Sequence, residues 1–151
     1  MMTFYNILIL IHIISAIIGI GPGFVLTTIV KHAHTMTDIR FAFTVKRRLH
    51  HFIQVGGALL LLSGLLLGVI TPSLFQQGWY LTSLVLYLLV LILGATLLRK
   101  ISAPIRQMLA DQTLTETPAY YHELRNRLLR VEYAVNALLL VIILLMVLKP
   151  F

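Results

Sequence analysis

The sequence predicts an all-α fold: an integral membrane four-helix bundle with its N- and C-termini both on the outer side of the membrane. Of its 151 residues, 59% are hydrophobic and only 11% are charged, which is far too apolar for a soluble domain of this size. Four apolar segments are long enough to cross about 30 Å of hydrocarbon. Each must be helical, because lipid offers no partner for free backbone groups. Residues 1–151 are expected to form one membrane domain.

The expected helices cover residues 4–30, 49–70, 80–98 and 119–148. A basic loop, residues 31–48, joins the first two. A short interfacial helix is expected after Pro104, where three apolar side chains are spaced for one stripe: Ile105, Met108 and Leu109. The last helix is expected to begin outside the membrane, because Thr117 can cap a helix that Pro118 opens.

The basic residues predict the orientation. Of the twelve Lys and Arg residues, all but Lys149 border the first and third loops, which the positive-inside rule places in the cytoplasm. The net charge of +7 is then explained by topology and by anionic lipid headgroups. Membrane lipids are therefore expected partners, and nucleic acid is not.

His12 is the clearest ionisable residue at membrane depth, roughly 10 Å below the outer surface by helix rise. A neutral imidazole there could ligate haem iron, bind another metal or relay protons. The alternative is a structural hydrogen bond between helices, for instance to the hydroxyl of Tyr87. Both interpretations stay open at this point.

A second polar group lies at the inner end of the last helix, where Glu132 and Asn136 share a face and Arg130 precedes them. It could hold a propionate or move a proton. The alternative is a salt bridge from Glu132 to Arg48 or Arg99 at the membrane boundary.

Small residues predict where the helices meet. Gly19 and Gly23 form one GxxxG pair, and Gly64 and Gly68 form another. Such faces can form a helix dimer or a slot for a flat ligand, but packing within one bundle is favoured because the bundle needs such contacts anyway. Pro22 is expected to kink the first helix.

Short motifs on the four expected helices follow one another in an order that can be compared with known membrane families. They are His12-Ile13-Ile14 with Phe24 and His32, then Arg48-Leu49 with Gly64-Leu65, then Gly78-Trp79, and finally Arg130 with Lys149-Pro150-Phe151. In order and spacing they resemble the bacterial four-helix protoporphyrinogen oxidase of the HemJ type, within a superfamily that includes copper-resistance protein D. The resemblance implies a multi-pass protein of the bacterial inner membrane that binds haem through its first-helix histidine.

Three positions depart from the oxidase pattern. Ser83 stands where that family has a lysine, Gly94 falls near the place of a histidine, and Glu132 and Asn136 replace an Asn-Glu-x-Pro pattern. A sister branch of unknown function therefore fits better than the oxidase itself.

The predicted function is a b-type haem protein acting in haem metabolism or in electron transfer near the quinone pool, with a porphyrin or a quinone as ligand. His12 is the expected metal ligand. The residues expected at the cofactor are His12, Arg48, Tyr87, Arg130, Glu132 and Asn136. The alternative is a non-catalytic accessory or assembly protein that binds a partner membrane protein or forms a homodimer. No catalytic residue is assigned, and whether the chain is an enzyme stays open.

Overall fold

Long helices make up the computed structural model, which describes residues 3–151. The α-helices are α1 (Phe4–His32), α2 (Met36–Ile70), α3 (Gly78–Leu93), α4 (Arg99–Ala110) and α5 (Ala119–Leu148). A short 3-10 helix, η1 (Pro72–Gln76), follows α2, and a π-helical segment, η2 (Gly94–Leu98), joins α3 to α4. Four continuous helices are apolar and long enough to cross a membrane, the third running from Gly78 to Ala110. The all-α, four-span prediction is confirmed.

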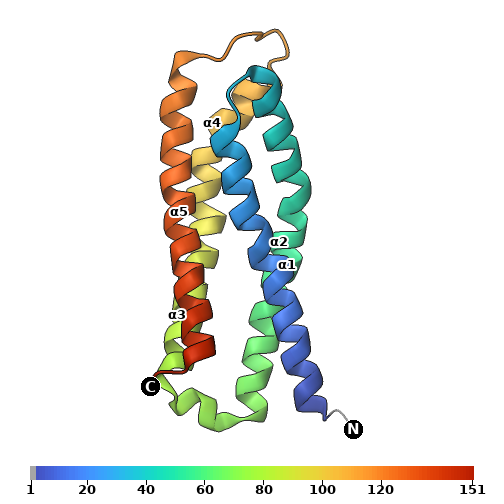
Figure 1. Cartoon of the computed structure of the whole chain (residues 1–151), viewed down its shortest axis with the longest axis vertical. Helices are drawn as coiled ribbons and strands as arrows, with labels where there is room; N and C mark the ends of the chain where they lie inside the picture. The colour runs from blue at the N-terminus through green and yellow to red at the C-terminus, as the bar shows by residue number, and fades with distance from the viewer. Residues whose placement is uncertain (1–2) are drawn as a thin grey trace.

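Both chain ends lie at one end of the bundle, and the α1–α2 and α4–α5 connections lie at the other (Figure 1). We call these the terminal end and the basic end, since eleven of the twelve Lys and Arg residues lie toward the latter. This arrangement agrees with an even number of membrane crossings. That the basic end is cytoplasmic remains a prediction of the positive-inside rule.

The expected basic loop at residues 31–48 is wrong, because α2 begins at Met36 rather than at residue 49. Thr35 and Asp38 form a capping box: Thr35 Oγ1 accepts the Asp38 N–H at 3.1 Å, and Asp38 Oδ2 accepts the Thr35 N–H at 3.1 Å. Ile39, on the first turn, is fully buried. Capping and burial together extend this helix well beyond its apolar part.

The separate interfacial helix expected after Pro104 is also wrong. Pro104 lies inside α4, which continues the third span through η2. The predicted apolar stripe exists, but Ile105 and Met108 are buried in a core with Val30, Ile39 and other side chains, instead of lying on the membrane surface. At the basic end the four spans therefore continue as a packed bundle with its own apolar core.

The last helix begins at Ala119 and ends at Leu148, as predicted. Its cap differs from the prediction, because Pro118 occupies the N-cap position and, within the described chain, no side chain caps the helix. The Tyr121 N–H bonds instead to the Pro118 carbonyl at 3.0 Å.

Arg40 of α2 fixes the connection between α4 and α5. Its guanidinium donates to the Asp111 carbonyl at 2.9 Å and to the Leu114 carbonyl at 3.1 Å. Within the connection, Asp111 Oδ1 accepts the Thr113 hydroxyl at 2.6 Å and the Thr113 N–H at 2.9 Å. These bonds lower the pKa of the Asp111 carboxyl, because they stabilise its charged form.

The backbones of α1 and α2 touch where three glycines meet. A Cβ built on Gly19 would lie 2.7 Å from the Gly57 nitrogen and 2.8 Å from the Gly56 carbonyl carbon. Side-chain atoms cannot fit there, so only glycine permits this approach. Gly23 and Gly68 contact side chains instead, Asn136 and Tyr80 respectively. The glycine faces therefore serve packing within the bundle.

Gly19→Ala is expected to lower the free energy of unfolding by about 1–3 kcal/mol, since the added methyl group must push two backbones apart. Gly21→Ala is the matched control on the same helix, because among the described residues no atom outside α1's own local backbone lies within 4 Å of a Cβ there. Unfolding of the detergent-solubilised protein, followed by circular dichroism, compares the two. Equal stability of the two variants would contradict the glycine contact.

Candidate functional site

His12 lies on the α2-facing side of α1 and is hydrogen-bonded to Ser63. The distance from His12 Nδ1 to Ser63 Oγ is 2.9 Å. Ser63 Oγ also lies 2.6 Å from the Leu59 carbonyl oxygen, which can only accept a hydrogen bond. The serine hydroxyl therefore donates to Leu59 and accepts from His12 Nδ1–H. In this tautomer the lone pair of Nε2 is free to bind a metal.

Gly64 makes room for the imidazole ring. A Cβ built on this residue would lie 3.1 Å from His12 Cε1, so the ring packs directly against the backbone of α2. The expected alternative, a hydrogen bond from His12 to a hydroxyl on another helix, is confirmed. The partner is Ser63 and not the example Tyr87, whose hydroxyl donates to the Gly57 carbonyl at 2.9 Å. The imidazole of His12 is thus positioned by Ser63 and Gly64 of α2.

Helix α3 presents three polar side chains toward the interior of the bundle. The Tyr80 hydroxyl donates to the Gly64 carbonyl at 3.0 Å. The Tyr87 hydroxyl donates to the Gly57 carbonyl, which lies closer to the basic end along α2. Between them Ser83 is 1% exposed, and its hydroxyl has no hydrogen-bond partner among residues 3–151. The sequence singled out Ser83 only as a departure from the oxidase pattern, and its burial depends on the rotation of α3, which the sequence does not specify.

Toward the basic end, Glu132 of α5 forms an ion pair with Lys46 of α2. The predicted bridges to Arg48 or Arg99 are wrong, because the early start of α2 carries Lys46 onto the side that faces α5. Arg48 itself is exposed. The second carboxylate oxygen of Glu132 is buried without a partner in the described chain. Lys46 is the functional candidate that the sequence analysis missed.

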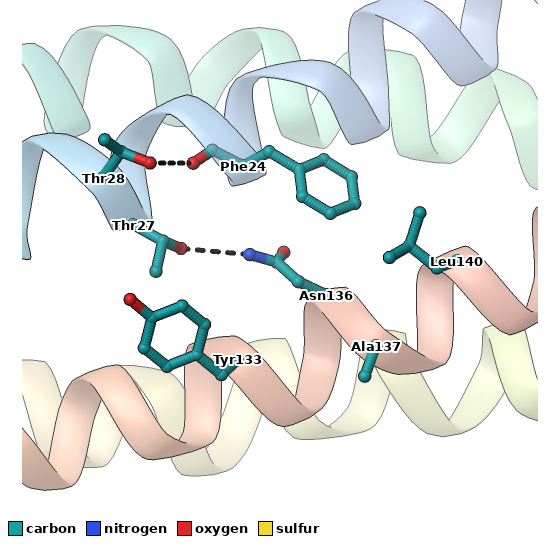
Figure 2. A pocket seen from close by; sticks show the side chains of 7 residues that line it. All are labelled: Phe24, Thr27, Thr28, Tyr133, Asn136, Ala137 and Leu140. Carbon is teal, nitrogen blue, oxygen red and sulfur yellow. Dashed lines mark hydrogen bonds between the residues drawn. The ribbon is translucent and has the colours of Figure 1, made fainter.

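Asn136, one turn along α5 from Glu132, connects α5 to α1. Its side-chain nitrogen donates to Thr27 Oγ1 at 3.1 Å, and that hydroxyl donates onward to the Gly23 carbonyl at 3.0 Å. Asn136 and Thr27 line a groove between the two helices. Figure 2 shows the bond between the two ribbons, with Phe24 and Leu140 toward one end. The groove has a volume of about 350 Å³.

The residues predicted to bind one cofactor lie in two places. His12 and Tyr87 lie toward the terminal end, whereas Glu132 and Asn136 lie toward the basic end. From His12 to Thr27, the partner of Asn136, the distance along α1 is about 22 Å by helix rise. Arg48 and Arg130 are exposed toward the basic end. Arg48 lies about 22 Å along α2 from Ser63, the partner of His12, and Arg130 lies nearer the basic end than Asn136 does. A single porphyrin bound to His12 cannot contact all of them.

His12 stands apart from the other histidine and carboxylate side chains of the described residues. A metal ion bound to it would therefore have one such ligand from this chain. Within residues 3–151, no three His, Asp or Glu side chains gather closely enough to hold an ion between them. A cofactor that brings its own ligands to the metal, as a porphyrin does, needs only one such residue.

Lys46→Met is expected to destabilise the protein by about 3 kcal/mol, because it leaves the Glu132 carboxylate buried without a cation. Adding Glu132→Leu is expected to restore most of the loss. Lys100→Met, an exposed lysine at the same end, is the control. Denaturant unfolding in detergent measures all four proteins, and a Lys46→Met variant as stable as Lys100→Met would show that the ion pair contributes nothing.

The comparison with known protein families assigns the chain at the level of a membrane family. A family model described as "Predicted integral membrane protein (DUF2269)" matches residues 6–150. No curated protein and no solved structure matches the chain. The match supports an integral membrane protein and carries no assignment to the HemJ-type oxidases or to copper-resistance protein D. With nearly its whole length covered, the chain belongs to the DUF2269 family of predicted integral membrane proteins.

Proposed function

We propose that the protein is a b-type haem protein of the membrane and that His12 Nε2 is an axial ligand of the iron. The single observation that carries the proposal is the hydrogen bond from His12 Nδ1 to Ser63. Metal-binding histidines commonly donate their other ring N–H to an oxygen, which fixes the tautomer and orients the ring. His12 has this arrangement, at a depth where an ionisable side chain is costly and usually functional.

Two further features support it. The backbone of Gly64 packs against the imidazole and limits its rotation. The order of the motifs around His12 also resembles that of the HemJ-type oxidases, as the sequence analysis described. Haem b would supply one-electron redox chemistry, which suits haem metabolism or electron transfer in a bacterial inner membrane.

The distances within the bundle restrict which residues could serve such a haem. Arg130, Glu132 and Asn136 lie too far toward the basic end to take part. The cation on the same side of the bilayer as His12 is Lys149, whose Nζ lies 5.4 Å from the centre of the Trp79 ring. The histidines other than His12 lie toward the basic end of the bundle, so one chain supplies one axial imidazole. A second would have to come from another copy.

His12→Ala is expected to abolish haem binding, because it removes the one histidine that residues 3–151 place at this depth. The measurement is the Soret absorbance of protein purified in detergent from haem-replete cells, before and after added haemin. His51→Ala, an exposed histidine at the basic end, should keep the Soret band.

Wild-type protein without a Soret band, even after added haemin, would contradict the proposal. It would leave the accessory role, in which the bundle binds a partner membrane protein, as the remaining candidate. An equal loss of haem in His51→Ala would contradict the assignment of the ligand to His12.

Ser63→Ala is expected to weaken haem binding by about 10- to 100-fold, since the ring loses the acceptor that fixes its tautomer. Ser73→Ala, at an exposed serine in η1, is the control. Haemin titration followed by absorbance gives both affinities. Unchanged affinity in Ser63→Ala would mean that the hydrogen bond is structural only.

A further inference from the structure

We propose that a groove along α5 binds one anionic glycerophospholipid, with its phosphate at Arg130 and an acyl chain extending toward Leu140. This site is separate from His12, and the proposal does not depend on haem. It rests on the shape of the groove, its length, and the order of polar and apolar groups along it.

The groove consists of two adjoining cavities that share Tyr133. One, of about 430 Å³, lies nearer the basic end and is lined by Asn126, Leu129 and Arg130 as well. The other, of about 350 Å³, continues between α1 and α5 to Leu140. Figure 2 shows this second part, with the polar side chains of Thr27, Tyr133 and Asn136 between the two ribbons. Tyr133 and Leu140 are about half exposed, so the groove opens to the surroundings of the bundle.

The length of the groove matches one leaflet. From Arg130 to Leu140 the helix rises about 15 Å. The hydrocarbon core of a bilayer is about 30 Å thick, so each leaflet contributes about half of that. A molecule whose head lies at Arg130 would therefore end near the middle of the membrane, as a single-leaflet lipid does.

The charge at the basic end of the groove suits an anion. Arg130 is exposed, and its Nε donates weakly to the carbonyl of Asn126 on its own helix, at 3.4 Å. The one ion pair within residues 3–151 joins Lys46 to Glu132, so the guanidinium has no carboxylate partner there. Because Glu132 is paired, its charge is compensated and does not oppose an anion at Arg130. Guanidinium groups bind phosphate through paired, charge-assisted hydrogen bonds.

Below the arginine, the groove offers hydrogen-bond donors at the depth of ester carbonyls. The Tyr133 hydroxyl makes no hydrogen bond to another described residue, and Asn136 uses one of its two side-chain N–H groups on Thr27. Beyond them the lining is apolar, with Phe24, Ala137 and Leu140. Anionic head, carbonyl acceptors and acyl chain follow in this order in a glycerophospholipid. A free phosphate would use Arg130 alone.

Native mass spectrometry of the full chain in a non-ionic detergent tests the proposal. Dioleoyl phosphatidylglycerol and dioleoyl phosphatidylcholine, which share their acyl chains, are titrated separately. One phosphatidylglycerol should be retained, at a concentration about tenfold lower than is needed for phosphatidylcholine. Arg130→Gln should remove this preference, and Arg127→Gln, at an exposed arginine outside the groove, should keep it.

A second pair of variants tests the groove by volume. Ala137→Trp fills the lipid-facing part and should prevent retention, whereas Ala134→Trp, exposed and outside the lining, should not. If Arg130→Gln does not fold, this pair of variants still tests whether the lipid binds in the groove. Equal retention of the two lipids, displacement by millimolar inorganic phosphate, or equal effects of Arg127→Gln and Arg130→Gln would overturn the proposal. So would tighter binding of a neutral isoprenoid quinone at the same groove.

Discussion

The contact between the backbones of α1 and α2 is the constraint on which the rest of the bundle depends. In lipid, apolar side chains gain little by leaving their surroundings, so helices associate through close packing and a few polar bonds. Gly19 against Gly56 and Gly57 brings the two backbones into direct contact. By fixing the register of the two helices, the contact also sets His12 opposite Ser63 and Gly64. A ring that is held by a 2.9 Å hydrogen bond and packs where Gly64 lacks a Cβ tolerates little sliding of either helix.

Polar bonds then attach the remaining helices at different depths. Tyr87 and Tyr80 join α3 to carbonyl groups of α2, Asn136 joins α5 to α1, and Glu132 joins α5 to α2. The four interactions join three pairs of helices: α3 with α2 through both tyrosines, α5 with α1, and α5 with α2. The hydroxyl of Ser83 and one oxygen of Glu132 are buried without partners in the described chain. Buried unpaired groups are costly in a low-dielectric interior. The Tyr121 hydroxyl, Arg40 Nε and Arg125 Nε are further examples in the described chain.

The sequence predicts the fold well and the side-chain pairs poorly, for a physical reason. Helix number and the all-α class follow from hydrophobic length, which the bilayer fixes. The start of the last helix at Ala119 follows instead from Pro118, which marks the helix boundary. The start of α2 was missed because composition suggested a loop, although Thr35 and Asp38 carry the capping signal. The partner of Glu132 depends on helix rotation, which turns by about 100° per residue, so Lys46 and Arg48 face different directions. For His12 the sequence indicated the residue and its depth, but not Ser63 or the resulting tautomer.

The early start of α2 also has a mechanical meaning. Between Met36 and Arg48 the helix rises about 20 Å before its apolar part begins, and α4 and α5 accompany it in a shared core. Helix α5 contains neither glycine nor proline from Ala119 to Leu148, so it has no residue that would act as a hinge. It behaves as one stiff rod that passes from the projecting part into the membrane, with the Lys46–Glu132 pair near the boundary. A displacement of the projecting part would therefore be carried into the membrane-spanning part of α5, with no residue in between at which the helix would bend.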